Sequence, residues 1–163
     1  MSKIQVNNLG IKLSKTTKVA IVFATYNSDI TNELLISALD TLGGAGVDGK
    51  NISVVDVPGA YELPYACQQL AQMNKYNAII SLGCVIKGQT PHFDYIALNA
   101  SRGIMNVSLK FDIPIVFGVL TTNTLAQAKA RIRGGNRGDK GAESAQTAIQ
   151  LIHTFNQKNK CKN

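Results

Sequence analysis

The chain has 163 residues, of which 45% are apolar and 17% charged, and a formal net charge of +7; this composition is typical of one globular domain and excludes a disordered chain. No apolar run reaches the roughly 18 residues of a membrane helix, and the first residues lack the apolar stretch of a secretory signal. The cysteine count is odd and contains no Cys-x-x-Cys pair, which argues against a disulfide framework or a zinc site and favours the reducing cytoplasm.

The first half of the chain alternates strand and helix patterns. After a polar leader over residues 1–17, residues 18–23 form an apolar run of strand length. Ser28 or Asp29 then caps a helix of apolar residues at helical spacing, which a group of glycines ends. A second strand follows over residues 52–57, and a helix is expected from about residue 62 to residue 73.

The second half repeats this pattern. Residues 78–82 predict a third strand, which a glycine-flanked loop joins to a long helix over about residues 91–110. Residues 113–120 predict the fourth strand. Two helices close the chain, near residues 124–132 and 142–155, before a basic tail over residues 156–163.

The strands read as apolar on both faces, which is typical of a parallel sheet covered by helices on both sides. Right-handed crossovers then favour a flavodoxin-like strand order. We therefore predict an α/β fold: one domain over residues 1–163, built as a flavodoxin-like three-layer sandwich with a four-stranded parallel sheet. The sequence leaves open whether the leader adds an edge strand, to this sheet or to that of a neighbouring subunit.

Ligands of open α/β sheets bind beyond the carboxyl ends of the strands. This rule predicts a site built from the segments that follow the four strands, namely residues 25–27, 59–62, 83–92 and 121–122. His92 is one of only two histidines and lies in such a segment. Its imidazole can transfer protons near neutral pH; the alternative is a histidine at a helix start that bonds to backbone or solvent.

Other polar and aromatic residues of these segments allow two interpretations each. Glu62 either caps a helix N-terminus or accepts a ligand N–H. Tyr26 either stacks on a flat ring or closes the core. Phe117 lies within an apolar strand and is expected in the core. No metal cluster, phosphate-binding Walker loop, dinucleotide fingerprint or Ser-His-Asp arrangement is found in the sequence.

A glycine-rich stretch carries most of the internal positive charge: Lys129, Arg131, Arg133, Arg137 and Lys140. Backbone N–H groups and arginines together favour a small phosphate ligand. Nucleic acid is disfavoured because the stretch has no aromatic residue on which a base could stack. A merely solvated loop remains open.

Several motifs in order resemble those of the lumazine synthase family. Residues 57–64 read VPGAYELP, and residues 83–95 read GCVIKGQTPHFDY. The strand block PIVFGVLTT over residues 114–122 and the DKGAE of residues 139–143 also resemble the family. The similarity extends over about residues 18–152.

This resemblance implies an enzyme of riboflavin biosynthesis. Such an enzyme condenses 5-amino-6-ribitylaminouracil with 3,4-dihydroxy-2-butanone 4-phosphate to give 6,7-dimethyl-8-ribityllumazine, releasing phosphate and water. It uses no metal and no organic cofactor. The alternative is a flavin- or lumazine-binding module that has kept the pocket and lost the chemistry.

The resemblance also assigns roles to residues. His92 is implied as the proton-transfer residue, and Tyr26 as the ring-stacking aromatic. The pyrimidine and ribityl side would be lined by Ala60, Tyr61, Glu62, Cys84, Val85, Ile86 and Phe117. Gln89 and Thr90 would hold the butanone phosphate together with Arg131, which a neighbouring subunit supplies in this family.

The chain departs from the family pattern in the basic loop, which is one residue longer. Either Lys140 or Arg137 matches the family lysine, and the Gly-Ala-Glu that follows favours Lys140. Cys84 is interpreted as a small neutral filler. The resemblance implies a homo-oligomer, either a pentamer or a shell of pentamers, and leaves open whether riboflavin synthase is enclosed.

Overall fold

The computed structural model describes residues 10–160. Its sheet has four parallel strands, β1 (Val19–Ala24), β2 (Ile52–Val57), β3 (Ala78–Ile86) and β4 (Ile115–Thr122), in the order β2-β1-β3-β4. This order confirms the predicted parallel sheet and agrees with a flavodoxin-like fold. The order reverses between β1 and β3, because the chain leaves β1 toward one edge of the sheet and later returns to form β3 on the other side of β1.

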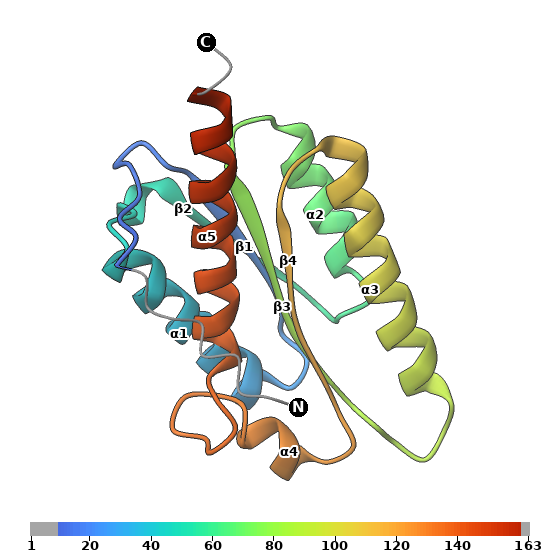
Figure 1. Cartoon of the computed structure of the whole chain (residues 1–163). Coiled ribbons are helices and arrows are strands. Elements are labelled where there is room, and N and C mark those ends of the chain that lie inside the picture. The colour runs from blue at the N-terminus through green and yellow to red at the C-terminus, as the bar shows by residue number, and fades with distance from the viewer. Residues whose placement is uncertain (1–9, 161–163) are drawn as a thin grey trace.

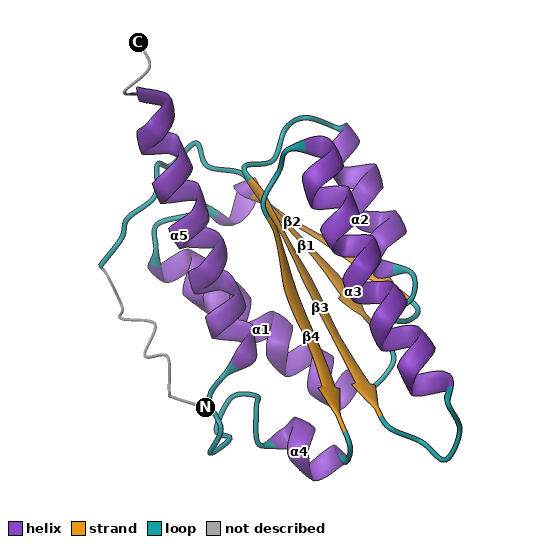
Figure 2. Cartoon of the chain, turned by 45° about the vertical axis from the view of Figure 1, so that its right-hand side comes forward, coloured by secondary structure: helices purple, strands orange, loops and turns teal. Residues whose placement is uncertain are grey.

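Helices cover both faces of the sheet, as predicted. Helices α1 (Ser28–Gly44) and α5 (Lys140–Lys160) lie on one face, and α2 (Leu63–Gln72) and α3 (His92–Phe111) lie on the other (Figures 1 and 2). The short helix α4 (Leu125–Lys129) follows β4 at the carboxyl end of the sheet, and a 3-10 turn (Gly49–Asn51) precedes β2. No helix among residues 10–160 has the length and hydropathy to cross a bilayer.

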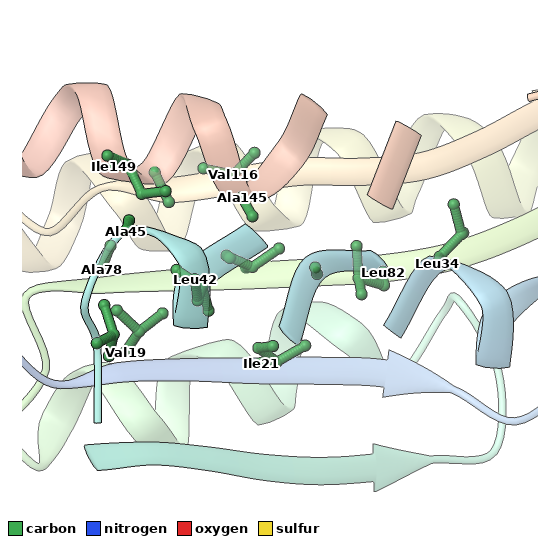
Figure 3. Close-up of a cluster of buried hydrophobic side chains, with 14 of the residues drawn as sticks. Val19, Ile21, Leu34, Leu42, Ala45, Ala78, Leu82, Val116, Ala145 and Ile149 are labelled. Carbon is green, nitrogen blue, oxygen red and sulfur yellow. The ribbon is translucent and has the colours of Figure 1, made fainter. Parts of the chain in front are cut away.

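Each face of the sheet forms its own hydrophobic cluster with the helices that cover it. On the α1/α5 face, Ile21 and Leu82 of the central strands meet Leu34 of α1 and Ala145 of α5 (Figure 3). On the other face, strand residues pack against buried residues of α2 and α3, including Cys67. The central strands β1 and β3 are therefore buried on both faces, which explains their continuous apolar runs.

The edge strands do not follow that pattern. The side chain of Val54 in β2 is 44% exposed and that of Phe117 in β4 is 42% exposed. The expectation that Phe117 lies in the core is therefore wrong, because β4 is an edge strand and this position of it stays exposed. Residues 10–17 form no strand, and residues 1–9 of the leader lie outside the described part of the chain.

The central strand β3 is longer than predicted, and this extension shapes the end of the sheet. Its pairing with β1 stops at Leu82, whereas its pairing with β4 continues to Ile86. Residues 83–86 therefore pair with β4 on one side only, and their other edge pairs with no strand of the described chain. A recess at the carboxyl end of the sheet follows from this difference in strand length.

Candidate active site

A cavity of about 610 Å³ occupies this recess. Its wall comes from the segments that follow β1 and β2, from the last residues of β3 and the loop after it, and from the first residues of α3: Tyr26, Asn27, Pro58, Gly59, Ala60, Tyr61, Glu62, Cys84, Val85, Ile86, Gly88, Thr90, His92, Phe93 and Ile96. The cavity thus lies where the strand order reverses, the usual ligand position in sheets of this kind.

The segment after β1 turns sharply over the cavity. The backbone N–H of Thr25 donates to the carbonyl of Val57 (2.8 Å) and that of Tyr26 to the carbonyl of Pro58 (3.0 Å), so β1 and the chain after β2 stay together beyond the sheet. The side chain of Tyr26 is 74% exposed. The interpretation of Tyr26 as a core residue is therefore wrong, and its ring is available to a ligand.

The segment after β2 places a carboxylate in the cavity wall. Ala60 is buried, whereas Tyr61 is largely exposed. Glu62 occupies the N-cap position of α2, but its side chain makes no capping hydrogen bond. A Cβ atom added to Gly59 would lie 3.0 Å from Oε2 of Glu62, so the carboxylate folds back over that glycine. The capping interpretation of Glu62 is therefore wrong, and the carboxylate is available to a donor in the cavity.

The end of β3 contributes a neutral thiol, and the start of α3 contributes an imidazole. Cys84 is 3% exposed, and burial raises the pKa of its thiol to about 11. A thiol of this kind stays protonated at neutral pH, in agreement with the interpretation as a neutral filler. His92 begins α3, is exposed, and makes no side-chain hydrogen bond with any described residue. Its imidazole is therefore open to the cavity.

The structure brings most of the expected site residues together and leaves four outside. Gln89 is exposed in the loop before α3, and Phe117 lies on β4. Arg131 lies between α4 and α5, and Lys140 is the first residue of α5. Pro58, Phe93 and Ile96 line the cavity and were not expected. A signal was available for Ile96, because it follows His92 by four residues and Phe93 by three within the predicted helix.

Comparison with known proteins identifies the family. A family model described as 6,7-dimethyl-8-ribityllumazine synthase matches residues 16–156. The chain belongs to the lumazine synthase family. A protein of Protochlamydia amoebophila (strain UWE25) named 6,7-dimethyl-8-ribityllumazine synthase is 44% identical over 147 residues, which is 90% of this chain and 84% of that relative. The resemblance of the motifs is therefore confirmed over nearly the whole chain.

The cationic side chains of the basic stretch in this lumazine synthase family member are not among those that line its own cavity. Arg133 pairs with Asp40 of α1, and Lys140 pairs with Glu143 one turn further along α5. Nη1 of Arg131 donates to the carbonyl of Gln127 at 2.8 Å. No lysine or arginine is among the residues that line the cavity. One copy of the described chain thus presents an aromatic, a carboxylate and an imidazole to a ligand, but no cation.

Metal chemistry finds no support in the described residues. No group of three or more histidine, cysteine, aspartate or glutamate side chains among them is placed to hold a metal ion. The thiols of Cys67 and Cys84 are both free and buried. Cys161 lies outside the described residues.

Proposed function

We propose that this chain catalyses the condensation of 5-amino-6-ribitylaminouracil with 3,4-dihydroxy-2-butanone 4-phosphate to give 6,7-dimethyl-8-ribityllumazine, releasing phosphate and water. The observation that carries the proposal is the position of His92, Glu62 and Tyr26 around one cavity in a chain of the lumazine synthase family. Their side chains supply a proton carrier, an acceptor and a flat ring.

The pyrimidine binds on the β3 side of the cavity. The ring of Tyr26 stacks on it, and the extension of β3 beyond β1 leaves backbone groups of Val85 and Ile86 for its polar edge. The carboxylate of Glu62 accepts hydrogen bonds from the ribityl side, where Ala60 and Tyr61 complete the wall. Cys84 fills the base of this region without adding charge.

The butanone phosphate binds between this ring and the start of α3. Thr90, with Gln89 beside it, supplies donors to the phosphate, and the cavity holds the ketone close to the amine. The amine attacks the ketone to form an imine, phosphate is eliminated, and the ring closes. His92 transfers protons during these steps, since each step moves a proton to or from a reacting atom.

A cation for the departing phosphate comes from a neighbouring copy of the chain. The cavity of one copy has none, while Arg131 lies half-buried in the loop after α4, Lys140 lies half-buried at the first residue of α5, and Phe117 presents an exposed aromatic ring on the edge strand β4. We assign Arg131 to the phosphate, because its planar fork matches phosphate oxygens. Lys140 and Phe117 enter the neighbouring site with it.

The outer face of α3 supports an oligomer independently. Tyr95, Leu98, Met105 and Leu109 are 65%, 47%, 59% and 74% exposed. Their spacing of three, seven and four residues follows the heptad pattern of helices that pack side by side. The proposed assembly is a pentamer or a shell of pentamers, and riboflavin synthase is the partner proposed for such a shell. The proposed location is the cytoplasm, because the two buried thiols are free, as in a reducing compartment.

The test is a condensation assay. Purified protein is mixed with both substrates, and the lumazine product is followed by absorbance and fluorescence against a mixture without protein, which measures the spontaneous condensation. Clear acceleration over that control is expected. Saturable changes in ligand fluorescence without product formation, from folded oligomeric protein, would instead indicate a binding module and refute the proposal.

A further inference from the structure

Asn27 combines an unusual backbone conformation with an unusual helix N-cap. Its backbone is in the left-handed region, with φ of 60° and ψ of 47°, which few non-glycine residues adopt and which asparagine tolerates better than most. It also occupies the N-cap of α1, a position at which asparagine side chains normally accept a backbone hydrogen bond of the first turn. The side chain of Asn27 makes no such bond.

The side-chain amide instead reaches across to another strand. Nδ2 of Asn27 donates to the backbone carbonyl of Cys84 at 2.9 Å, 57 residues further along the chain. This bond joins the turn between β1 and α1 to the part of β3 that extends beyond its pairing with β1. It therefore spans the place where the strand order reverses, and both residues line the cavity.

The surrounding bonds hold the neighbouring residue at the same time. The N–H of Tyr26 donates to the carbonyl of Pro58, and the carbonyl of Asn27 accepts from the N–H of Ile30 in α1. The turn is thus fixed to the chain after β2, to β3 and to α1. Departures from local preference that persist at a cavity are typical of functional positions.

We propose that Asn27 is a positioning residue for the pyrimidine half of the reaction, an inference that rests on the proposed function. Its amide sets the distance between the exposed ring of Tyr26 and the backbone of Val85 and Ile86. The Tyr26 ring binds the face of the pyrimidine and the backbone of Val85 and Ile86 binds its polar edge, so loss of the amide loosens the spacing between these two contacts. The phosphate half of the cavity, around Thr90, is not joined by this bond.

Two substitutions separate the effect of the side-chain hydrogen bond from the effect of the left-handed backbone conformation. Asn27→Asp keeps the size and the tolerance of a left-handed conformation, but places a carboxylate oxygen against the carbonyl of Cys84. Asn27→Gly adopts the conformation at least as easily and only removes the bond. We expect the KM for the pyrimidine to rise about fivefold to tenfold in Asn27→Asp, because repulsion between the carboxylate and the carbonyl adds to the loss of one neutral hydrogen bond. A smaller rise is expected in Asn27→Gly.

The KM for the butanone phosphate should change less than about twofold in both variants, a split that general loosening of the fold would not produce. Asn74 provides a matched control. It is also left-handed, with φ of 51°, and its Nδ2 donates to the carbonyl of Gln72, but it lies outside the cavity. Asn74→Asp should leave both KM values unchanged.

Two kinetic outcomes would overturn the proposal. Equal increases of both KM values would indicate a merely structural role. An unchanged KM for the pyrimidine in Asn27→Asp would show that the hydrogen bond to Cys84 has no effect on binding. If the same KM were raised in Asn27→Gly, Asn27 would instead contact the ligand directly through Oδ1, which Asp retains.

Amide hydrogen exchange of residues 84–88 is measured in the same variants. It should become faster in Asn27→Asp and stay unchanged in Asn74→Asp; unchanged exchange in Asn27→Asp would refute the tether. Exchange does not depend on turnover, so it tests the tether even if the wild-type chain fails to accelerate the condensation. That failure would concern the proposed function and not Asn27.

Discussion

The hydroxyl of Ser37 on α1 donates a hydrogen bond of 2.7 Å to Oδ2 of Asp139, the residue directly before α5. The other carboxylate oxygen of Asp139 accepts from the backbone N–H of Ala142 at 3.1 Å, in the first turn of α5. One aspartate therefore accepts a hydrogen bond from a free backbone N–H group in the first turn of α5 and also joins α5 to α1. The two helices approach closely at this point, and Gly141 is the residue that permits it.

Gly141→Ala should destabilise the fold. An added Cβ would lie 2.2 Å from the carbonyl oxygen of Leu34 and 2.8 Å from its Cα, so the backbone of α1 would have to move. We expect the free energy of unfolding to fall by about 1–3 kcal/mol, as for overpacked cores. Urea unfolding measures the change. Gly43→Ala, in the last turn of α1 with nothing within 4 Å, should instead raise stability by up to about 1 kcal/mol.

The architecture was predictable because its central strands are uniformly buried. The apolar runs of β1 and β3 could only be accommodated in a parallel sheet with helices on both faces. The edge strands were harder, since an edge strand with an exposed Phe117 has the same apolar sequence as a buried one. What covers β4 depends on the path of α3, which no pattern within residues 113–120 encodes.

The cavity was predictable as a set of segments but not as a set of contacts. The strand-end rule gave the segments that contain Tyr26, Glu62 and His92. It could not give the hydrogen bond from Asn27 to Cys84, because this bond depends on β3 extending four residues past its pairing with β1. Nor could spacing alone show that Arg131 lies outside the cavity of its own chain.

Removal of the cavity imidazole should slow turnover. His92→Ala removes the proton carrier, and we expect kcat to fall at least about tenfold. The loss should be smaller than in many acid–base enzymes, because the condensation also proceeds spontaneously. His153→Ala, at the only other histidine and on α5, is the control and should turn over normally. Equal rates for wild type and His92→Ala would remove His92 from the mechanism.

Weaker phosphate binding is expected for Arg131→Ala. Loss of a charge-assisted hydrogen bond should raise the KM for the butanone phosphate on the order of tenfold or more. The KM for the pyrimidine should change little. Steady-state kinetics with each substrate varied in turn separates the two effects.

Mixed oligomers test whether Arg131 acts across an interface. The His92→Ala and Arg131→Ala variants are unfolded together in equal amounts and refolded. If each site combines His92 of one copy with Arg131 of the next, about a quarter of the sites regain both residues and activity returns. Sites formed within one chain would regain nothing, and the mixture would stay at the mean of the two variants.

The buried thiol of Cys67 should make stability fall at alkaline pH. Burial raises the pKa of Cys67 from 9.0 to about 12 in the folded protein. Between these values the unfolded chain has released the proton and the folded chain still holds it, so stability decreases as the pH rises. Each pH unit above 9 should remove about 1.4 kcal/mol through this group. Urea unfolding between pH 8 and about 10.5 should show a steeper slope for wild type than for Cys67→Ala; equal slopes would contradict the assignment.

A charge on the outer face of α3 should dissociate the oligomer. Met105 is 59% exposed in the middle of the heptad-spaced residues, and Met105→Glu would place a carboxylate among Leu98 and Leu109 of adjoining helices. We expect light scattering to show a smaller species at micromolar concentration.

Activity should fall with the oligomer, because the cavity then lacks the arginine of its neighbour. Met73→Glu makes the same change at a methionine that is 53% exposed at the end of α2, outside that face. It should leave both mass and turnover unchanged. A monomeric Met105→Glu variant with full activity would show that one copy forms a complete site, and the role of Arg131 across the interface would be wrong.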